Sequence, residues 1–218
     1  MKGSARTFAI IKGLQTGGIS QAELEEIYGQ HKDEYRVLLH LAQHPKFPQG
    51  LAQGIISKLF AVDLVRVIKN VRTNPFIRKK AELEFSQRYK RLALGEKISL
   101  LKMAPNSLLL TLSEENQPQL IEAILQSNHC SEDVVLRFVN RRAERSNFYV
   151  ALDATQWHQN PAVAEAVAHD LEAPIKILLK IIPFLGLSGL QKLLRDENTH
   201  RTVCARIQDF MEKRNAGV

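Results

Sequence analysis

The chain has 218 residues, of which 44% are hydrophobic and 24% charged, and its formal net charge is +7. This composition is that of a folded globular protein and argues against intrinsic disorder. Two cysteines, Cys130 and Cys204, are too few and too far apart for a disulfide framework or a paired-cysteine zinc site. We therefore expect a reducing, cytoplasmic location.

The apolar residues are mostly Leu, Ile, Val and Ala, while aromatic residues make up only 6% of the chain. This bias favours helix packing over a sheet. No window approaches the roughly 18 to 20 apolar residues of a membrane-spanning helix. Lys12 interrupts the short apolar run near the N-terminus, so we expect no signal peptide.

The first 34 residues predict an N-terminal helical cap. A first helix is expected over Ser4–Leu14, ended by Gly17 and Gly18 because adjacent glycines disfavour a helix interior. Ser20 and Glu23 have the spacing of a capping box, which predicts a second helix running to about His31.

From residue 35 the pattern becomes one of paired helices. Leucines and isoleucines at helical spacing predict one pair over 35–59, and Asp63 is expected to cap the next helix. Asn74-Pro75 predicts the start of a longer helix that reaches Leu92. Its buried stripe is expected to comprise Ile77, Ala81, Phe85, Tyr89 and Leu92.

Shorter helices follow to the end of the chain. Ser107–Leu112 has strand propensity, but no second strand-like run accompanies it, so a helix is favoured. The further helices are expected at 95–101, 107–112, 118–126, 131–141, 148–157, 161–168, 174–182, 187–194 and 199–213.

One phrase recurs between about residues 40 and 183: an Asn, His or Gln, a Pro or Ser at a helix start, and then an aliphatic helix. A stack of short helix pairs needs frequent helix starts and turns of this kind, because each pair buries its apolar face only against its neighbours. The sequence predicts an all-α fold, an α-α superhelix forming one continuous domain. Residues 35–183 would be the repeats and 184–218 the C-terminal capping helices.

Three segments carry a family likeness: Leu38–Ala42 before a proline turn, Val67–Asn70 before Asn74-Pro75, and Ala123–Asn128 before Ser131. They resemble bacterial HEAT-like or leucine-rich-repeat-variant α-solenoids over roughly residues 35–183. The resemblance implies a solenoid that acts mostly as a scaffold for protein partners. A HEAT-like minority binds DNA and removes alkylated bases.

The positive charge is concentrated in one segment. Between Arg66 and Lys102 there are 11 basic residues and 3 acidic ones. Within the predicted helix, Lys79 and Lys90 fall opposite the apolar stripe, and Lys80 and Arg91 flank it. Because a local excess attracts polyanions or acidic surfaces, this segment and a second arginine group are the candidate binding region. The candidate residues are Arg66, Lys69, Arg72, Arg78, Lys79, Lys80, Lys90, Arg91, Arg137, Arg141, Arg142 and Arg145.

Three arrangements resemble parts of catalytic or metal sites. His40 and His44 have the spacing of half a zinc site, but no third ligand is near in sequence. His129-Cys130 is better explained by the helix start at Ser131. Asp153 and Trp157 resemble a carboxylate and an aromatic ring that bind a nucleotide base flipped out of a duplex, although core packing explains the lone Trp better. We therefore expect no catalytic residue, metal or cofactor.

Together these features predict a non-catalytic intracellular scaffold that binds an acidic protein partner. The alternative is a HEAT-like protein that binds nucleic acid as duplex DNA. A base-excision glycosylase is the third interpretation. The sequence does not specify an oligomeric state.

Overall fold

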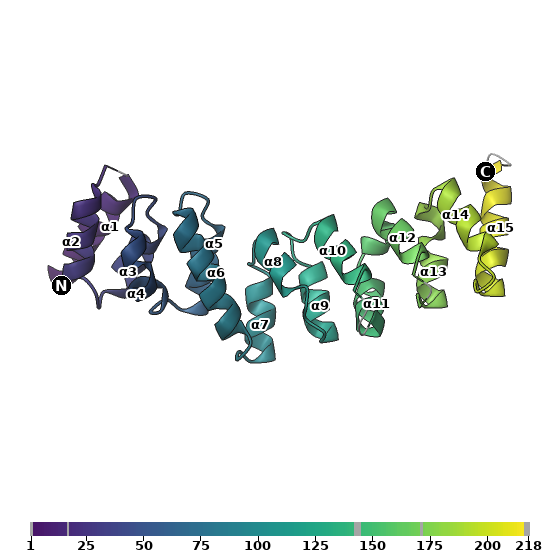
Figure 1. Cartoon of the computed structure of the whole chain (residues 1–218), viewed down its shortest axis with the longest axis horizontal. Helices are drawn as coiled ribbons and strands as arrows, with labels where there is room; N and C mark the ends of the chain where they lie inside the picture. The colour runs from purple at the N-terminus through teal and green to yellow at the C-terminus, as the bar shows by residue number, and fades with distance from the viewer. Residues whose placement is uncertain (1, 17, 142–144, 171, 216–218) are drawn as a thin grey trace. The chain divides into compact units, whose positions relative to one another are not determined.

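The computed structural model is all-helical (Figure 1). It describes residues 2–16, 18–141, 145–170 and 172–215, and these ranges contain no β-strand. The prediction of an all-α, repeat-like fold is confirmed. The helices pack into two compact units, unit 1 (Met1–Pro105) and unit 2 (Asn106–Val218), and the division falls inside the predicted repeat segment.

In unit 1, alternate helices pack on one another. α1 packs on α3, α3 on α5 and α5 on α7, while α4 packs on α6. Each helix pair thus contacts the next along the chain. The helices of unit 1 are α1 Lys2–Thr16, α2 Gln21–Gln30, α3 Tyr35–Gln43, the 3₁₀ helix η1 Gln49–Leu51, α4 Ala52–Ile56, α5 Ala61–Lys69, α6 Pro75–Tyr89 and α7 Leu94–Leu101.

Unit 2 follows the same principle. α8, α10, α12 and α14 pack in succession, α9 packs on α11, and α13 packs on α15. The helices are α8 Asn106–Leu112, α9 Pro118–Leu125, α10 Glu132–Val139, α11 Arg145–Asp153, η2 Trp157–Gln159, α12 Pro161–Ala168, α13 Ile175–Ile181, η3 Ile182–Phe184, α14 Leu187–Arg195 and α15 Arg201–Asn215.

Several helix starts are capped as the sequence predicts. Ser20 and Glu23 form the capping box at α2, with each side chain accepting a hydrogen bond from the other residue's backbone amide. The side chain of Asn74 accepts from the amide of Phe76 at 2.9 Å, and that of Asn160 accepts from the amide of Val163 at 3.1 Å. The segment 107–112 is helical, as expected.

Other local predictions are wrong. Asp63 does not cap α5, because the helix begins two residues earlier, at Ala61. The hydroxyl of Ser131 makes no cap to α10 and hydrogen-bonds Asn106 at 2.9 Å. α11 spans Arg145–Asp153, whereas 148–157 was expected. Asp63 and Ser131 bind residues of a neighbouring repeat and therefore do not cap the helices beside them. α11 ends at Asp153, where a turn begins.

Polar cross-links between the helix pairs span a narrow range of sequence separation. In the described residues, the shortest of these links are 21 residues apart, joining Tyr149 to Asp170 and Glu165 to Gly186, and the longest joins Trp157 and Leu125, 32 apart. A compact globular core would also bring together residues much farther apart in sequence. Within each unit, the narrow range therefore indicates a stack in which each repeat contacts its neighbours.

Candidate partner-binding surface

α6 has two clearly different faces. Ile77, Ala81, Phe85 and Tyr89 are buried against the rest of unit 1, with at most 1% of each residue exposed. The opposite face carries residues three or four apart, which brings them into one row on the helix surface. We call this row the α6 stripe, and it consists of Phe76, Lys79, Lys80, Leu83, Gln87 and Lys90.

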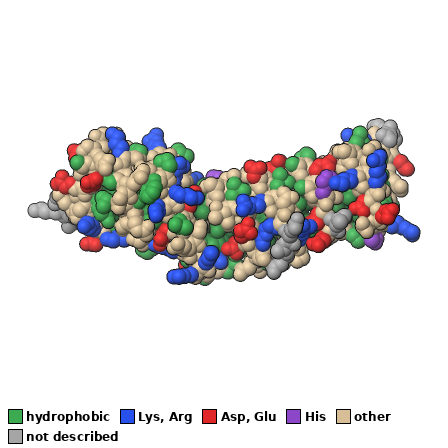
Figure 2. Space-filling model, viewed as in Figure 1, with side chains coloured by type: hydrophobic (Ala, Val, Ile, Leu, Met, Phe, Trp, Pro, Cys, Tyr) green, Lys and Arg blue, Asp and Glu red, His purple; other side chains and the backbone are tan. Residues whose placement is uncertain are grey.

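The α6 stripe interleaves large apolar side chains with lysines. Phe76 is 41% exposed and Leu83 is 55% exposed. The ammonium of Lys80 lies 5.7 Å from the centroid of the Phe76 ring, a cation–π contact. Lys79 lies 3.3 Å from Glu82 but remains largely exposed. Figure 2 shows hydrophobic side chains among Lys and Arg over unit 1.

The other basic candidates of unit 1 differ in their exposure and in the contacts they make. Arg66 donates to Asp63 at 2.7 Å, yet 56% of its side chain is exposed. Arg78 is half-buried, and its Nε atom has no hydrogen-bond partner among the described residues. The exposed candidates are Lys69, Arg72, Lys90 and Arg91. Lys90 belongs to the α6 stripe, and Arg91 follows it in the chain.

Asp63 belongs to a part-buried network that links α3 to α5. Its carboxylate contacts the hydroxyl of Tyr35 and the guanidinium of Arg66. The Tyr35 hydroxyl also accepts from the amide of Phe60 at 2.9 Å. Burial, together with the hydrogen bond to Asp63, raises the pKa of Tyr35 to about 12. The network explains why an aspartate is buried inside the first turn of α5.

The second arginine group belongs to unit 2, and most of it is engaged within the chain. Arg141 donates to the carbonyls of Ser113 and Glu115, at 2.8 and 2.9 Å. Arg145 forms an ion pair with Asp170. Arg137 is exposed, with Glu114 3.4 Å away. Arg142 lies outside the described residues.

The binding of helix-end carbonyls by a basic side chain recurs along the stack. Lys58 donates to the carbonyl of Lys32, after α2, and Arg88 donates to that of Ser57, after α4. Arg141 does the same after α8. Carbonyls at a helix C-terminus lack partners within the helix, so these cations satisfy them. This role was not predicted from the sequence. A basic residue near the end of the second helix of a pair is the pattern that would have indicated it.

The rings of His40 and His44 each contact the backbone of their own chain. His44 is buried, and its Nδ1 accepts a hydrogen bond from the amide of Lys46 at 3.2 Å. Burial, with the nearby Lys46, lowers the pKa of His44. The ring of His40 lies instead against its own helix, with Nδ1 2.8 Å from the carbonyl of Arg36. Within the described ranges, no three His, Cys, Asp or Glu side chains are placed to hold a metal ion.

The thiol of Cys130 is held in its protonated form. Burial raises its pKa to about 12, and its sulfur lies 3.7 Å from the carbonyl of Ser131. A nucleophilic cysteine needs a lowered pKa. The environment of Cys130 therefore opposes the thiolate that a nucleophile beside His129 would require.

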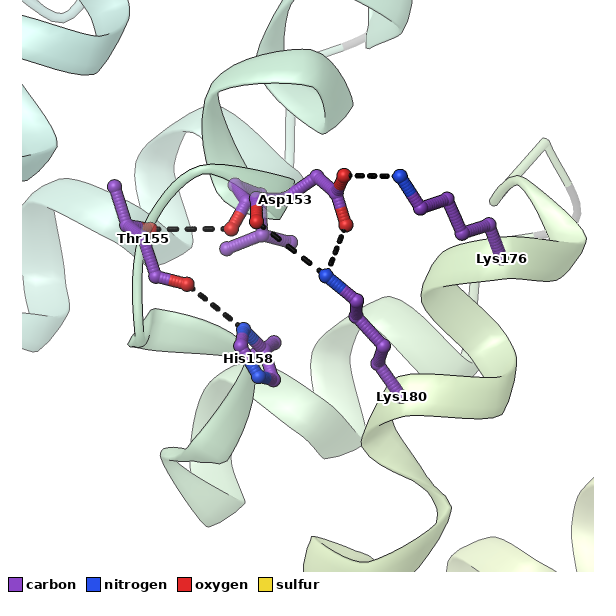
Figure 3. Close-up of polar contacts among 6 residues, drawn as sticks. Asp153, Thr155, His158, Lys176 and Lys180 are labelled. Atoms are coloured by element: carbon purple, nitrogen blue, oxygen red, sulfur yellow. Dashed lines mark hydrogen bonds and ion pairs between the residues drawn. The ribbon is translucent and has the colours of Figure 1, made fainter.

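Asp153 and Trp157 contact different parts of the chain. Asp153 lies at the end of α11, where the ammonium groups of Lys176 and Lys180 reach its two carboxylate oxygens from α13 (Figure 3). The indole of Trp157 donates to the carbonyl of Leu125 at 2.8 Å. Trp157 lines a pocket of about 390 Å³ whose lining does not include Asp153. This aspartate links two successive repeats.

The link at Asp153 predicts a pH dependence of stability. Hydrogen bonds from Lys176 and Lys180 lower the pKa of Asp153 below its ordinary value. A carboxylate with a lowered folded-state pKa stabilises the fold above its unfolded pKa of about 3.9, and this contribution is lost as pH falls through the folded-state value. The thermal midpoint of the natural chain should therefore fall more steeply below about pH 4 than that of Asp153→Asn. Parallel midpoint curves would contradict the link.

No helix among the described residues combines the length and the apolar character needed to cross a membrane. The chain was compared with family models, curated proteins and solved structures. None of the three comparisons gave a match.

Proposed function

We propose that this chain is a non-catalytic scaffold that binds an acidic protein partner through the α6 stripe. The observation that carries the proposal is that Phe76 and Leu83 alternate with the exposed Lys79 and Lys90 and the half-buried Lys80 on the face of α6 opposite its buried residues. Protein interfaces combine an apolar centre with polar and charged groups at the rim. Opposite charges then steer the encounter and set the orientation of the partner.

Duplex DNA is the second candidate ligand, because unit 1 contains 18 basic and 9 acidic side chains, a formal charge of +9. DNA binding without sequence preference draws on cations that neutralise phosphates. An exposed Leu83 contributes little to such contacts. Arg141 and Arg145 are also already bound to groups of their own chain. These observations favour the acidic protein partner.

Reversing the charge of Lys79, Lys80, Lys90 and Arg91 to Glu should weaken capture of the acidic partner at least about a hundredfold, because attractive contacts become repulsive. Affinity is measured by titration against the acidic proteins that the natural chain retains and releases in high salt. A matched control reverses Lys192, Arg195, Arg201 and Arg214, which are exposed in unit 2 and give the same change in net charge. Unchanged capture by the α6 variant would remove the stripe from the mechanism.

A second variant separates the two ligand classes. Phe76→Ser with Leu83→Ser keeps every charge but removes the apolar contacts. If the partner is a protein, its binding should fall at least about tenfold, since buried anchors carry most of an interface's energy. Binding to a short duplex, followed by gel shift across a salt series, should be unaffected by the double substitution. Tight, steeply salt-dependent duplex binding with no protein capture would support the DNA function instead.

A further inference from the structure

The chain carries surfaces of opposite charge in its two units. Unit 1 has a formal charge of +9, whereas unit 2 contains 12 basic and 14 acidic side chains, a charge of −2. Three exposed carboxylates of unit 2 lie at the start of α10 and just after α8. We call this region the α10 acidic surface, and it consists of Glu114, Glu132 and Asp133. One molecule thus carries both a basic stripe and an acidic surface.

The α10 acidic surface borders a pocket lined by two carboxylates, an apolar side chain and two arginines. The pocket has a volume of about 460 Å³, and its lining includes Glu114, Asp133, Leu136, Arg137 and Arg141. Leu136 supplies a half-buried apolar wall. The guanidinium of Arg141 is bound to backbone carbonyls, and Arg137 lies beside Glu114. Asp133 is exposed and forms no ion pair among the described residues, so it can receive a cation from outside the chain.

We propose that the acidic partner of the α6 stripe is a second copy of this chain, bound through its α10 acidic surface. This inference rests on the proposed function and names the partner. Lys79 and Lys80 of one copy meet Glu132 and Asp133 of the other, while Phe76 or Leu83 enters the pocket beside Leu136. Because the two surfaces differ, each contact leaves one stripe and one acidic surface free, so copies add head to tail into a chain or a ring.

Sedimentation velocity of the full chain across a micromolar concentration series tests the inference. The natural chain should form species larger than a dimer in about 50 mM salt and dissociate in about 500 mM salt, because screening weakens contacts between exposed charges. A stripe variant, Lys79→Gln with Lys80→Gln and Lys90→Gln, and an acidic-surface variant, Glu132→Gln with Asp133→Asn, should each associate at least about tenfold more weakly. Circular dichroism checks that both variants remain folded.

Mixing the two variants gives the sharpest outcome. The stripe variant keeps an intact acidic surface, and the acidic-surface variant keeps an intact stripe. An equimolar mixture should therefore form a 1:1 complex that cannot grow further. Association that neither variant weakens, or a mixture that stays monomeric while the natural chain assembles, would overturn the contact. If the natural chain is monomeric at every concentration but its stripe still captures another acidic protein, this inference fails and the proposed function stands.

Discussion

Replacing Asp170 with alanine is expected to lower the free energy of unfolding by about 3 kcal/mol, because it leaves a desolvated cation without its partner. The carboxylate of Asp170 is 5% exposed and contacts both the guanidinium of Arg145 and the hydroxyl of Tyr149. Burial and the hydrogen bond to Asp170 raise the pKa of Tyr149, so this hydroxyl remains a donor. Arg145 keeps some contact with water, which places the expected loss at the lower end of the range for buried pairs.

Urea unfolding of Asp170→Ala against the natural chain measures the loss. Asp170→Asn is the matched control: it preserves the size of the side chain and one acceptor oxygen, so it should be destabilised less than the alanine variant. Hydrogen exchange should locate the effect. In a stack of repeats, stability is carried by neighbouring contacts, so amides of α11 and α12 should lose protection before those of unit 1. A loss below about 1 kcal/mol would mean that Arg145 and Tyr149 find other partners.

The helices could be predicted from the sequence because their signals are local. Ser20, Asn74 and Asn160 each bind a backbone amide two or three residues away, so each capping residue directly precedes the helix that it starts. Asp63 also has a short polar side chain that often caps helices, but its role differs, since it binds Tyr35 from 28 residues away. Nothing in the local pattern separates these two uses of a short polar side chain.

The candidate site could be predicted in part. The charge excess and the helical wheel located the exposed lysines of α6, and Lys79 and Lys90 do lie opposite the buried stripe. The same wheel places Phe76 and Leu83 among those lysines, a signal that counting charges overlooks. Counting also treats every arginine alike. Arg141 is bound to carbonyls 26 and 28 residues away, which only the stacking of the repeats reveals.

Replacing Phe85 with alanine is expected to cost about 3 to 5 kcal/mol, because a fully buried aromatic ring leaves a cavity that a packed core cannot close. Phe85 has no exposed surface, and its ring centroid lies 5.6 Å from that of Tyr89. The expected loss is a large share of the stability of a typical domain. Thermal and urea unfolding of the variant measure it, and a cost below about 1.5 kcal/mol would mean that α6 repacks around the smaller side chain.

Phe76→Ala is the matched control on the same helix. Phe76 is 41% exposed, so its removal should change the free energy of unfolding by less than about 0.5 kcal/mol. If the α6 stripe binds a partner, the same change should nevertheless weaken binding about tenfold or more. The two phenylalanines thus separate the two faces of α6: Phe85 holds the helix against the rest of unit 1, and Phe76 lies exposed on the opposite face. An exposed aromatic ring that contributes to binding and not to stability is what an interaction surface requires.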